Sequence, residues 1–67
     1  MNQRDRILQY LGNGSVLTRI NSWAYLGILE APARISELRK LGHPIVTTMV
    51  TVDNRFGEKV RIAEWRL

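Results

Sequence analysis

The chain lacks cysteine, so neither a disulfide bond nor a zinc site built on thiolates can stabilise its fold. It also lacks an apolar run approaching the roughly 20 residues of a transmembrane helix, and its first residues, MNQRDRIL, are too polar for a signal peptide. The single histidine, His43, has no carboxylate cluster near it in the sequence, so we expect a turn residue there and neither a metal nor a cofactor. Together these absences predict a cytoplasmic protein without membrane association.

The groups that would indicate an enzyme are missing as well. One histidine, no cysteine and no paired carboxylates placed across a cleft leave no candidate for acid–base or nucleophilic catalysis. No glycine-rich phosphate loop is present, because each glycine falls at a predicted helix end or turn. A chain of this size also has little volume left for a substrate pocket, so we expect a protein that is not an enzyme.

The length limits the size of the fold, and the charge limits the kind of partner. Sixty-seven residues predict one domain, residues 1–67, in which only about 60% of the surface of the unfolded chain can be buried. The net charge is +4, and eight of the ten basic residues are arginine, whose planar guanidinium suits bidentate contact with phosphate. This composition favours a polyanionic partner, although many small domains carry such a charge and bind nothing acidic.

Two short helices are predicted before residue 28. Asn2 can cap the first helix, which Gly12 ends, and its inward residues are Ile7, Leu8 and Leu11. Ser15 to Leu17 then form a three-residue strand that could add to the edge of a hairpin.

The second helix, Arg19–Leu26, is capped by Thr18 and ended by Gly27 in a left-handed conformation. We expect its core side to consist of Ile20, Trp23 and Ala24. Trp23 could also stack on a nucleobase, but a tryptophan at this spacing is more typical of a core.

The stretch Leu29–Leu41 is predicted to be the central helix. Pro32 is tolerated in its first turn, where amide hydrogens have no helical acceptor, and Gly42 with Pro44 ends it. The apolar residues at helical spacing are Ala31, Ile35 and Leu38, with Leu41 one turn on. The opposite face carries Ala33, Ser36, Glu37 and Lys40. These side chains are small or polar, so this face can fit closely against a partner.

From Ile45 onward the apolar period changes from helical to two. The run IVTTMVTV is rich in β-branched residues and favours a strand, and residues 53–57 form a turn in which Gly57 can take a positive φ. Lys59–Trp65 is the returning strand. Of its two faces, we expect the one with Ala63, Trp65 and Leu67 to be buried, because tryptophan offers the largest apolar area. The other face carries Val60, Ile62 and Glu64.

This order of elements predicts an α+β fold of the winged helix-turn-helix type. It has three helices, a short strand and a C-terminal two-stranded β-hairpin, which is the wing. The second and third helices form the element that reads a duplex, and the wing tip is Asn54–Gly57.

The chain resembles the small winged helix-turn-helix proteins encoded by bacteriophages and prophages. The resemblance lies in ARISELRKLGHPI, NRFGEKVRIAEWRL, the strand and threonine Val16-Leu17-Thr18, and the Gly27-Ile28 corner. It covers most of the chain after Asn13. Just after the corner, similar proteins often carry Ser or Thr and a basic residue, whereas this chain has Leu29 and Glu30. The resemblance implies DNA binding in the cytoplasm of a bacterial host, for transcription regulation or for organising phage DNA as an excisionase does.

The first hypothesis is therefore sequence-selective binding of double-stranded DNA, with the third helix in the major groove and the wing on the flanking groove or backbone. The residues expected to contact bases are Glu30, Pro32, Ala33, Ser36, Glu37 and Lys40. Those expected to contact phosphates, or to reach the DNA from the wing, are Arg19, Ser22, Arg39, Asn54, Arg55, Lys59 and Arg61. For Arg55 and Lys59, a protective charge on a hairpin edge is an equally good explanation. One module buries only about 600–1,000 Å² on DNA, so a homodimer or side-by-side copies are expected.

The alternative hypothesis is a protein–protein interaction module that uses the same scaffold against a host or phage protein. Four residues could form a small exposed apolar patch of the kind that marks protein partners: Leu29, Pro32, Ala33 and Phe56. The acidic Glu30 and Glu37 on the third helix favour this alternative, because carboxylates repel phosphates.

Overall fold

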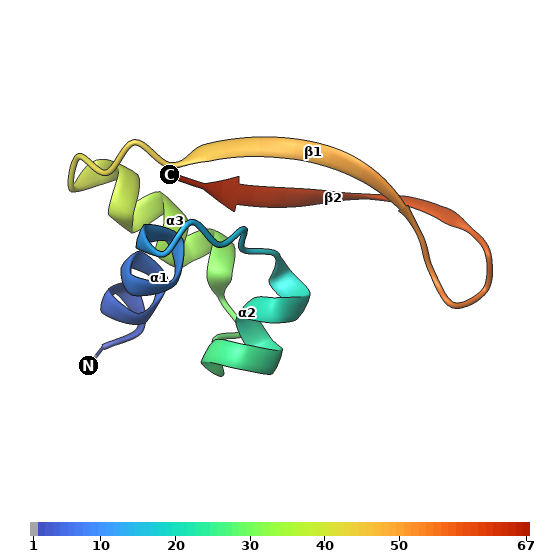
Figure 1. Cartoon of the computed structure of the whole chain (residues 1–67), viewed down its shortest axis with the longest axis horizontal. Coiled ribbons are helices and arrows are strands. Elements are labelled where there is room, and N and C mark those ends of the chain that lie inside the picture. Colours follow the sequence, from blue (N-terminus) through green and yellow to red (C-terminus); the bar gives the residue numbers. More distant parts are fainter. Residues whose placement is uncertain (1) are drawn as a thin grey trace.

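The computed structural model describes residues 2–67 as three helices followed by one antiparallel hairpin (Figure 1). The elements are α1 (Gln3–Gly12), α2 (Arg19–Leu26), α3 (Ala31–Lys40), β1 (Val46–Asp53) and β2 (Lys59–Arg66). The helices gather into one body and the hairpin extends from it, so the molecule measures 37 × 21 × 21 Å (Figure 1). The predicted α+β class is confirmed. The longest helices in the described part of the chain have ten residues, and none could cross a bilayer.

Side-chain caps define where α1 and α2 begin. The Asn2 side chain accepts a hydrogen bond from the amide of Asp5 at 2.8 Å, as the sequence predicts. At α2, Thr18 and Asn21 form a capping box, in which each side chain accepts a hydrogen bond from the backbone amide of the other residue. Asn21 also donates to the carbonyl oxygen of Val16 at 3.0 Å. The start of α2 is therefore tied to the segment before it.

Helix α2 buries a serine rather than the apolar side predicted from the sequence. Ile20, Trp23 and Ala24 are exposed, and Trp23 is 57% accessible, so the prediction that they form the core side is wrong. Ser22 is fully buried instead. Its hydroxyl donates to the carbonyl oxygen of Ile28 at 3.0 Å, and the amide of Ile28 donates to the Ser22 carbonyl at 3.1 Å. A small, hydrogen-bonded side chain lets the turn into α3 lie close against α2.

Helix α3 begins at Ala31, two residues later than predicted. Glu30 is its N-cap and makes no side-chain capping bond to residues 2–67, while Pro32 occupies the first turn, where its missing amide hydrogen costs nothing. The predicted core face is confirmed for Ala31, Ile35 and Leu38, which are all buried. Leu41, the fourth residue predicted on this face, is the C-cap beyond the last turn and is 63% accessible, so that part of the prediction is wrong. Each helix contacts the other two, so the buried face of α3 packs against both α1 and α2 in the core of the three-helix body.

The base of the hairpin completes that core. Trp65 is 5% accessible and pairs with Leu17 through two backbone hydrogen bonds of 2.8 and 2.9 Å, so the predicted three-residue strand is reduced to a single bridge. Trp65 is buried and Ala63 packs against the core, as predicted, but Leu67 is 52% accessible and that part of the prediction is wrong. The core residues are Ile7, Leu11, Leu17, Ile28, Ala31, Ile35, Leu38, Ile45 and Trp65.

Beyond this base, both faces of the wing are exposed to solvent. The face turned away from Trp65 carries the cross-strand pairs Val50–Ile62 and Val52–Val60, and both members of the second pair are exposed. The turn at the tip uses Gly57 with φ of +75°, the positive value expected. Packing against the body therefore does not stabilise the outer half of the wing.

Candidate nucleic-acid interface

One face of α3 is open to a partner. Ser36 and Lys40 are exposed and Ala33 is partly exposed, on the side opposite to the buried residues of the helix. None of the three is in the core. The small Ala33 and Ser36 leave room for a close approach, and Lys40 adds a positive charge at the C-terminal end of α3. The predicted reading face is thus accessible.

Glu37 lies at the edge of this open face rather than in its centre. Its carboxylate forms an ion pair of 3.0 Å with Arg34, one turn earlier on α3. Both side chains are partly buried, so the carboxylate is turned toward α1 and part of its charge is neutralised. Any base contact by Glu37 has to compete with this ion pair.

A groove separates the N-terminal ends of α2 and α3 from the wing. Its volume is about 490 Å³, and its lining combines two arginines, Arg19 and Arg61, with mainly apolar residues. The lining residues are Arg19, Pro32, Thr47, Met49, Arg61, Ile62, Ala63 and Trp65. The predicted phosphate contacts Arg19 and Arg61, from distant parts of the sequence, are therefore brought to one groove beside α3. Pro32, predicted to contact bases, lines the same groove.

Two other predicted phosphate contacts have structural partners. Ser22 has no accessible surface and its hydroxyl is bound to Ile28, so the prediction that it contacts phosphate is wrong. Arg39 is exposed, but its Nε donates to the carbonyl oxygen of Ile45 at 3.0 Å and its Nη2 donates to the hydroxyl of Thr47. Arg39 therefore ties α3 to the start of the wing.

The wing tip combines one structural residue with exposed basic ones. The Asn54 side chain accepts hydrogen bonds from the amides of Phe56 and Glu58 at 2.9 and 3.0 Å and donates to the Glu58 carboxylate at 3.1 Å, so it shapes the turn. Arg55 is exposed in this turn. Lys59 is exposed and forms an ion pair of 3.4 Å with Asp53 across the strands. An exposed pair of this kind contributes little to stability, so Lys59 stays available to an anion.

Residues that start the central helix face solvent. Glu30 is exposed at the N-terminus of α3, next to the exposed Leu29. A carboxylate at this position is favoured by the helix dipole, but it would repel a phosphate approaching the same end. A phosphate is therefore disfavoured at this end of α3.

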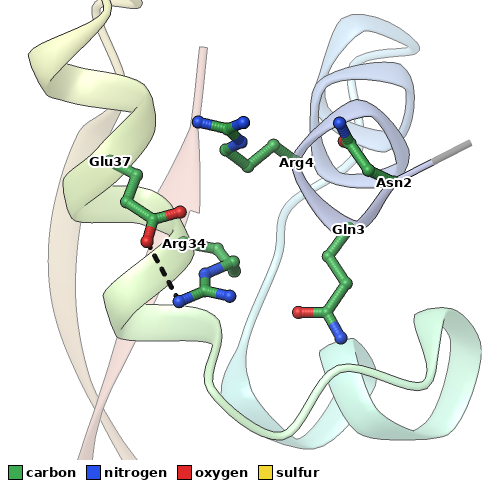
Figure 2. A pocket seen from close by; sticks show the side chains of 5 residues that line it. All are labelled: Asn2, Gln3, Arg4, Arg34 and Glu37. Carbon is green, nitrogen blue, oxygen red and sulfur yellow. Dashed lines mark ion pairs between the residues drawn. The ribbon is translucent and has the colours of Figure 1, made fainter.

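Sequence reasoning missed two arginines on the other side of α3. Arg4 and Arg34 line a pocket of about 400 Å³ between α1 and α3, together with Asn2, Gln3 and Glu37 (Figure 2). The i, i+3 spacing of Arg34 and Glu37 indicated their ion pair, but no local signal indicated that α1 would bring Arg4 to them.

It also missed an apolar surface on α2. Ile20, Trp23, Ala24 and Leu29 are all exposed, and they line one shallow depression together with Arg19. The apolar patch predicted from Leu29, Pro32, Ala33 and Phe56 is not continuous. The tip loop that contains Phe56 lies at the far end of the wing from the helices (Figure 1).

A three-helix body with an open third helix and a basic hairpin beside it defines the winged helix-turn-helix class. The sequence matches the family model of the winged helix-turn-helix domain over residues 2–67, and the chain belongs to this family. Domains of this class are typically non-catalytic and bind DNA, which suggests DNA as the partner. No curated protein and no solved structure matches the chain. Residues 2–67 contain no group of three histidine or carboxylate side chains that could hold a metal ion.

Proposed function

We propose that the protein binds double-stranded DNA, with α3 in the major groove and the wing on the flanking groove or backbone. Its role is that of a phage-encoded transcriptional regulator or an excisionase-like architectural factor in a bacterial host cell. The observation that carries this proposal is the open face of α3 lying beside a groove with two arginines, Arg19 and Arg61. A helix in the major groove needs such basic groups where the phosphates run.

The open face of α3 supplies the base contacts in this proposal. Ala33 can contact a thymine methyl group, and Ser36 can bond to a base edge or to a phosphate. Lys40 is exposed at the end of the same face. Glu30 and Glu37 can each accept a hydrogen bond from cytosine N4, in the case of Glu37 after release from Arg34. Pro32 shapes the leading end of the helix.

The wing and α2 supply the phosphate contacts. Arg19 and Arg61 flank the path of one backbone strand through the groove, and the exposed Arg55 and Lys59 extend this basic surface to the wing tip. Such contacts account for most of the affinity and for little of the sequence selectivity. The 67 residues act as one DNA-binding unit, and tight binding requires a homodimer or copies side by side, because one module covers only about 600–1,000 Å².

Titration of duplex DNA of random sequence at several salt concentrations tests the proposal. We expect log K to fall linearly with log salt, with a slope of about −0.9 for each phosphate neutralised. Helicity measured by circular dichroism confirms that the protein stays folded across the series. Absence of binding by the folded protein, or a response that is flat in salt, contradicts DNA binding.

Two variants separate phosphate contacts from base contacts. Arg55→Ala should weaken binding to all duplexes alike and make the salt slope shallower by about 0.9. Ser36→Ala should change which sequences are recovered in a selection from a random pool, at nearly unchanged slope. The recovered sequences also show whether the site is a single copy, a palindrome or a tandem. If neither variant changes anything, α3 and the wing are not the DNA-binding surface.

A second candidate function, docking of a host or phage protein, is supported by the exposed apolar surface on α2. Ile20, Trp23 and Leu29 together make a surface of the type that marks protein partners. Ile20→Ser should remove such an interaction and leave DNA binding unchanged. If the protein binds DNA and neither self-associates nor captures a protein through this surface, the second candidate fails.

A further inference from the structure

We infer that the pocket between α1 and α3 holds a phosphate of the second DNA strand, on the side of α3 opposite to the wing. This inference rests on the proposed function and adds to it a site that uses Arg4 and Arg34. The pocket has a volume of about 400 Å³, enough for a phosphodiester group with its water.

The first reason is the position of the pocket relative to the open face of α3. At 100° per residue, Pro32 and Arg39 lie on one side of that face, and Arg34 lies on the other. Pro32 lines the groove next to the wing and Arg39 is bonded to Thr47 of β1, whereas Arg34 lines the pocket next to α1. The open face of α3 therefore has the groove with Arg19 and Arg61 on one side and the pocket with Arg4 and Arg34 on the other.

The second reason is the shape of DNA. An α-helix with its side chains is about 10–12 Å across, and the major groove is about 12 Å wide. A helix seated in the groove therefore has a phosphate backbone close to each of its sides. The wing-side groove with Arg19 and Arg61 can meet one backbone, and the pocket next to α1 lies where the other backbone runs.

The third reason is that the two arginines have unused hydrogen-bonding capacity. Figure 2 shows the Arg4 side chain reaching from α1 toward α3, and Arg34 reaching from α3 into the space between the helices. Among residues 2–67, Arg4 takes part in none of the ion pairs, and the Nε of Arg34 is buried without a hydrogen-bond partner. The ion pair with Glu37 occupies only Nη2 of Arg34. A guanidinium has five N–H donors, so several remain for phosphate oxygens.

Glu37 sets the balance of charge in the pocket. Its carboxylate neutralises part of the charge of Arg34, whereas Arg4 takes part in none of the ion pairs among residues 2–67. The pocket is therefore weakly positive, which suits one phosphate rather than a cluster of anions. The polar side chains of Asn2 and Gln3, at the N-terminus of α1, complete its lining.

The test compares Arg4→Gln with Arg66→Gln in the salt titration on random duplex DNA. Both variants lose one positive charge, but Arg66 is on β2, paired with Glu64 at 3.2 Å, and is absent from the pocket and the groove. We expect a slope that is shallower by about 0.9 for Arg4→Gln than for Arg66→Gln. Equivalently, the deficit of Arg4→Gln relative to Arg66→Gln should shrink about 3.5-fold when salt is raised fourfold.

Failure of the inference and failure of the proposed function give different results. If the wild type binds with a salt slope and the two variants have the same slope, the pocket holds no phosphate, yet DNA binding stands. If the wild type does not bind, DNA binding itself is wrong. Ethylation interference with the wild type alone gives a second measurement that does not depend on the fold of a variant. Within the contact made by one copy, blocking phosphates on both backbones that flank the major groove support the inference, and blocking phosphates only on the backbone next to the wing overturn it.

Discussion

The three-helix body and the wing place their apolar residues in opposite environments. In the body, Ile7, Leu17 and Ile35 are at most 1% accessible. In the outer wing, Val52 and Val60 are 37% and 38% accessible although they pair directly across the strands. An isolated two-stranded hairpin is marginally stable in water at best, so the wing depends on its base, where Trp65 joins the core.

The contrast in burial indicates which parts of the chain are under structural constraint. The free energy of folding comes mainly from the body, since burial of apolar surface contributes about 25 cal/mol per Å² and the wing buries little. Side chains of the outer wing can therefore vary, and serve binding, with little effect on the free energy of folding. The basic residues Arg55 and Lys59 lie there, whereas Arg61 lies closer to the body, where it lines the groove beside α2 and α3.

The largest expected effect comes from a cavity in the body. Ile35→Ala should lower the free energy of unfolding by about 2–5 kcal/mol, because Ile35 is buried among the core residues of α3 and the space it leaves cannot fully collapse. A domain of this size has little stability to lose, so we expect a large drop in the melting temperature or loss of the fold. The measurement is urea unfolding followed by circular dichroism. A change below about 1 kcal/mol would mean that the body is not the main source of stability.

An intermediate effect is expected at the buried serine of α2. Ser22→Ala removes the donor to the carbonyl oxygen of Ile28 and should cost about 1–3 kcal/mol, less about 0.5 kcal/mol gained from the higher helix propensity of alanine. Ser36→Ala is the matched control. It makes the same change at an exposed position of a helix, so it shares the propensity gain without the loss. Equal stabilities of the two variants would show that Ser22 is not a buried contact between α2 and the turn.

The smallest effect is expected on the outer face of the wing. Val60→Thr keeps the shape of the side chain and adds a hydroxyl that solvent can satisfy, so stability should stay within about 0.5 kcal/mol of the wild type. Thermal unfolding at two protein concentrations measures this. A loss above about 1 kcal/mol that grows with concentration would show that this face is covered by a second copy, and the contrast between body and wing would then apply only to the monomer.

Signals close together in the sequence predicted the elements well. The caps at Asn2 and Thr18, the glycine at position 27 and Pro32 act within one turn of the backbone they affect, so the bounds of α2 match those predicted and α3 starts within two residues. The buried face of α3 was also predictable, because three apolar residues there recur at helical spacing.

Helix α2 is the element for which such local signals gave a wrong prediction. Ile20, Trp23 and Ala24 share one side, which a local pattern assigns to the core, yet that side is exposed and Ser22 is buried. The outcome depends on Ile28, six residues away, whose carbonyl oxygen and amide both bond to Ser22. Eight residues are too few for hydrophobic periodicity to outweigh such a contact. The candidate site was also beyond the reach of local signals. Arg19 and Arg61 are far apart in the sequence and line one groove only because the hairpin returns to the helices.

Capping, turn and periodic signals act over a few residues, so the amino-acid sequence predicted the order and type of the helices and hairpin strands, their approximate bounds, and the open side of α3. The packing of the helices sets which side of α2 is buried, and it brings Arg4 of α1 beside Arg34. The physical reason is that burial and charge depend on what lies across the fold, and those neighbours are set by the packing of all three helices at once.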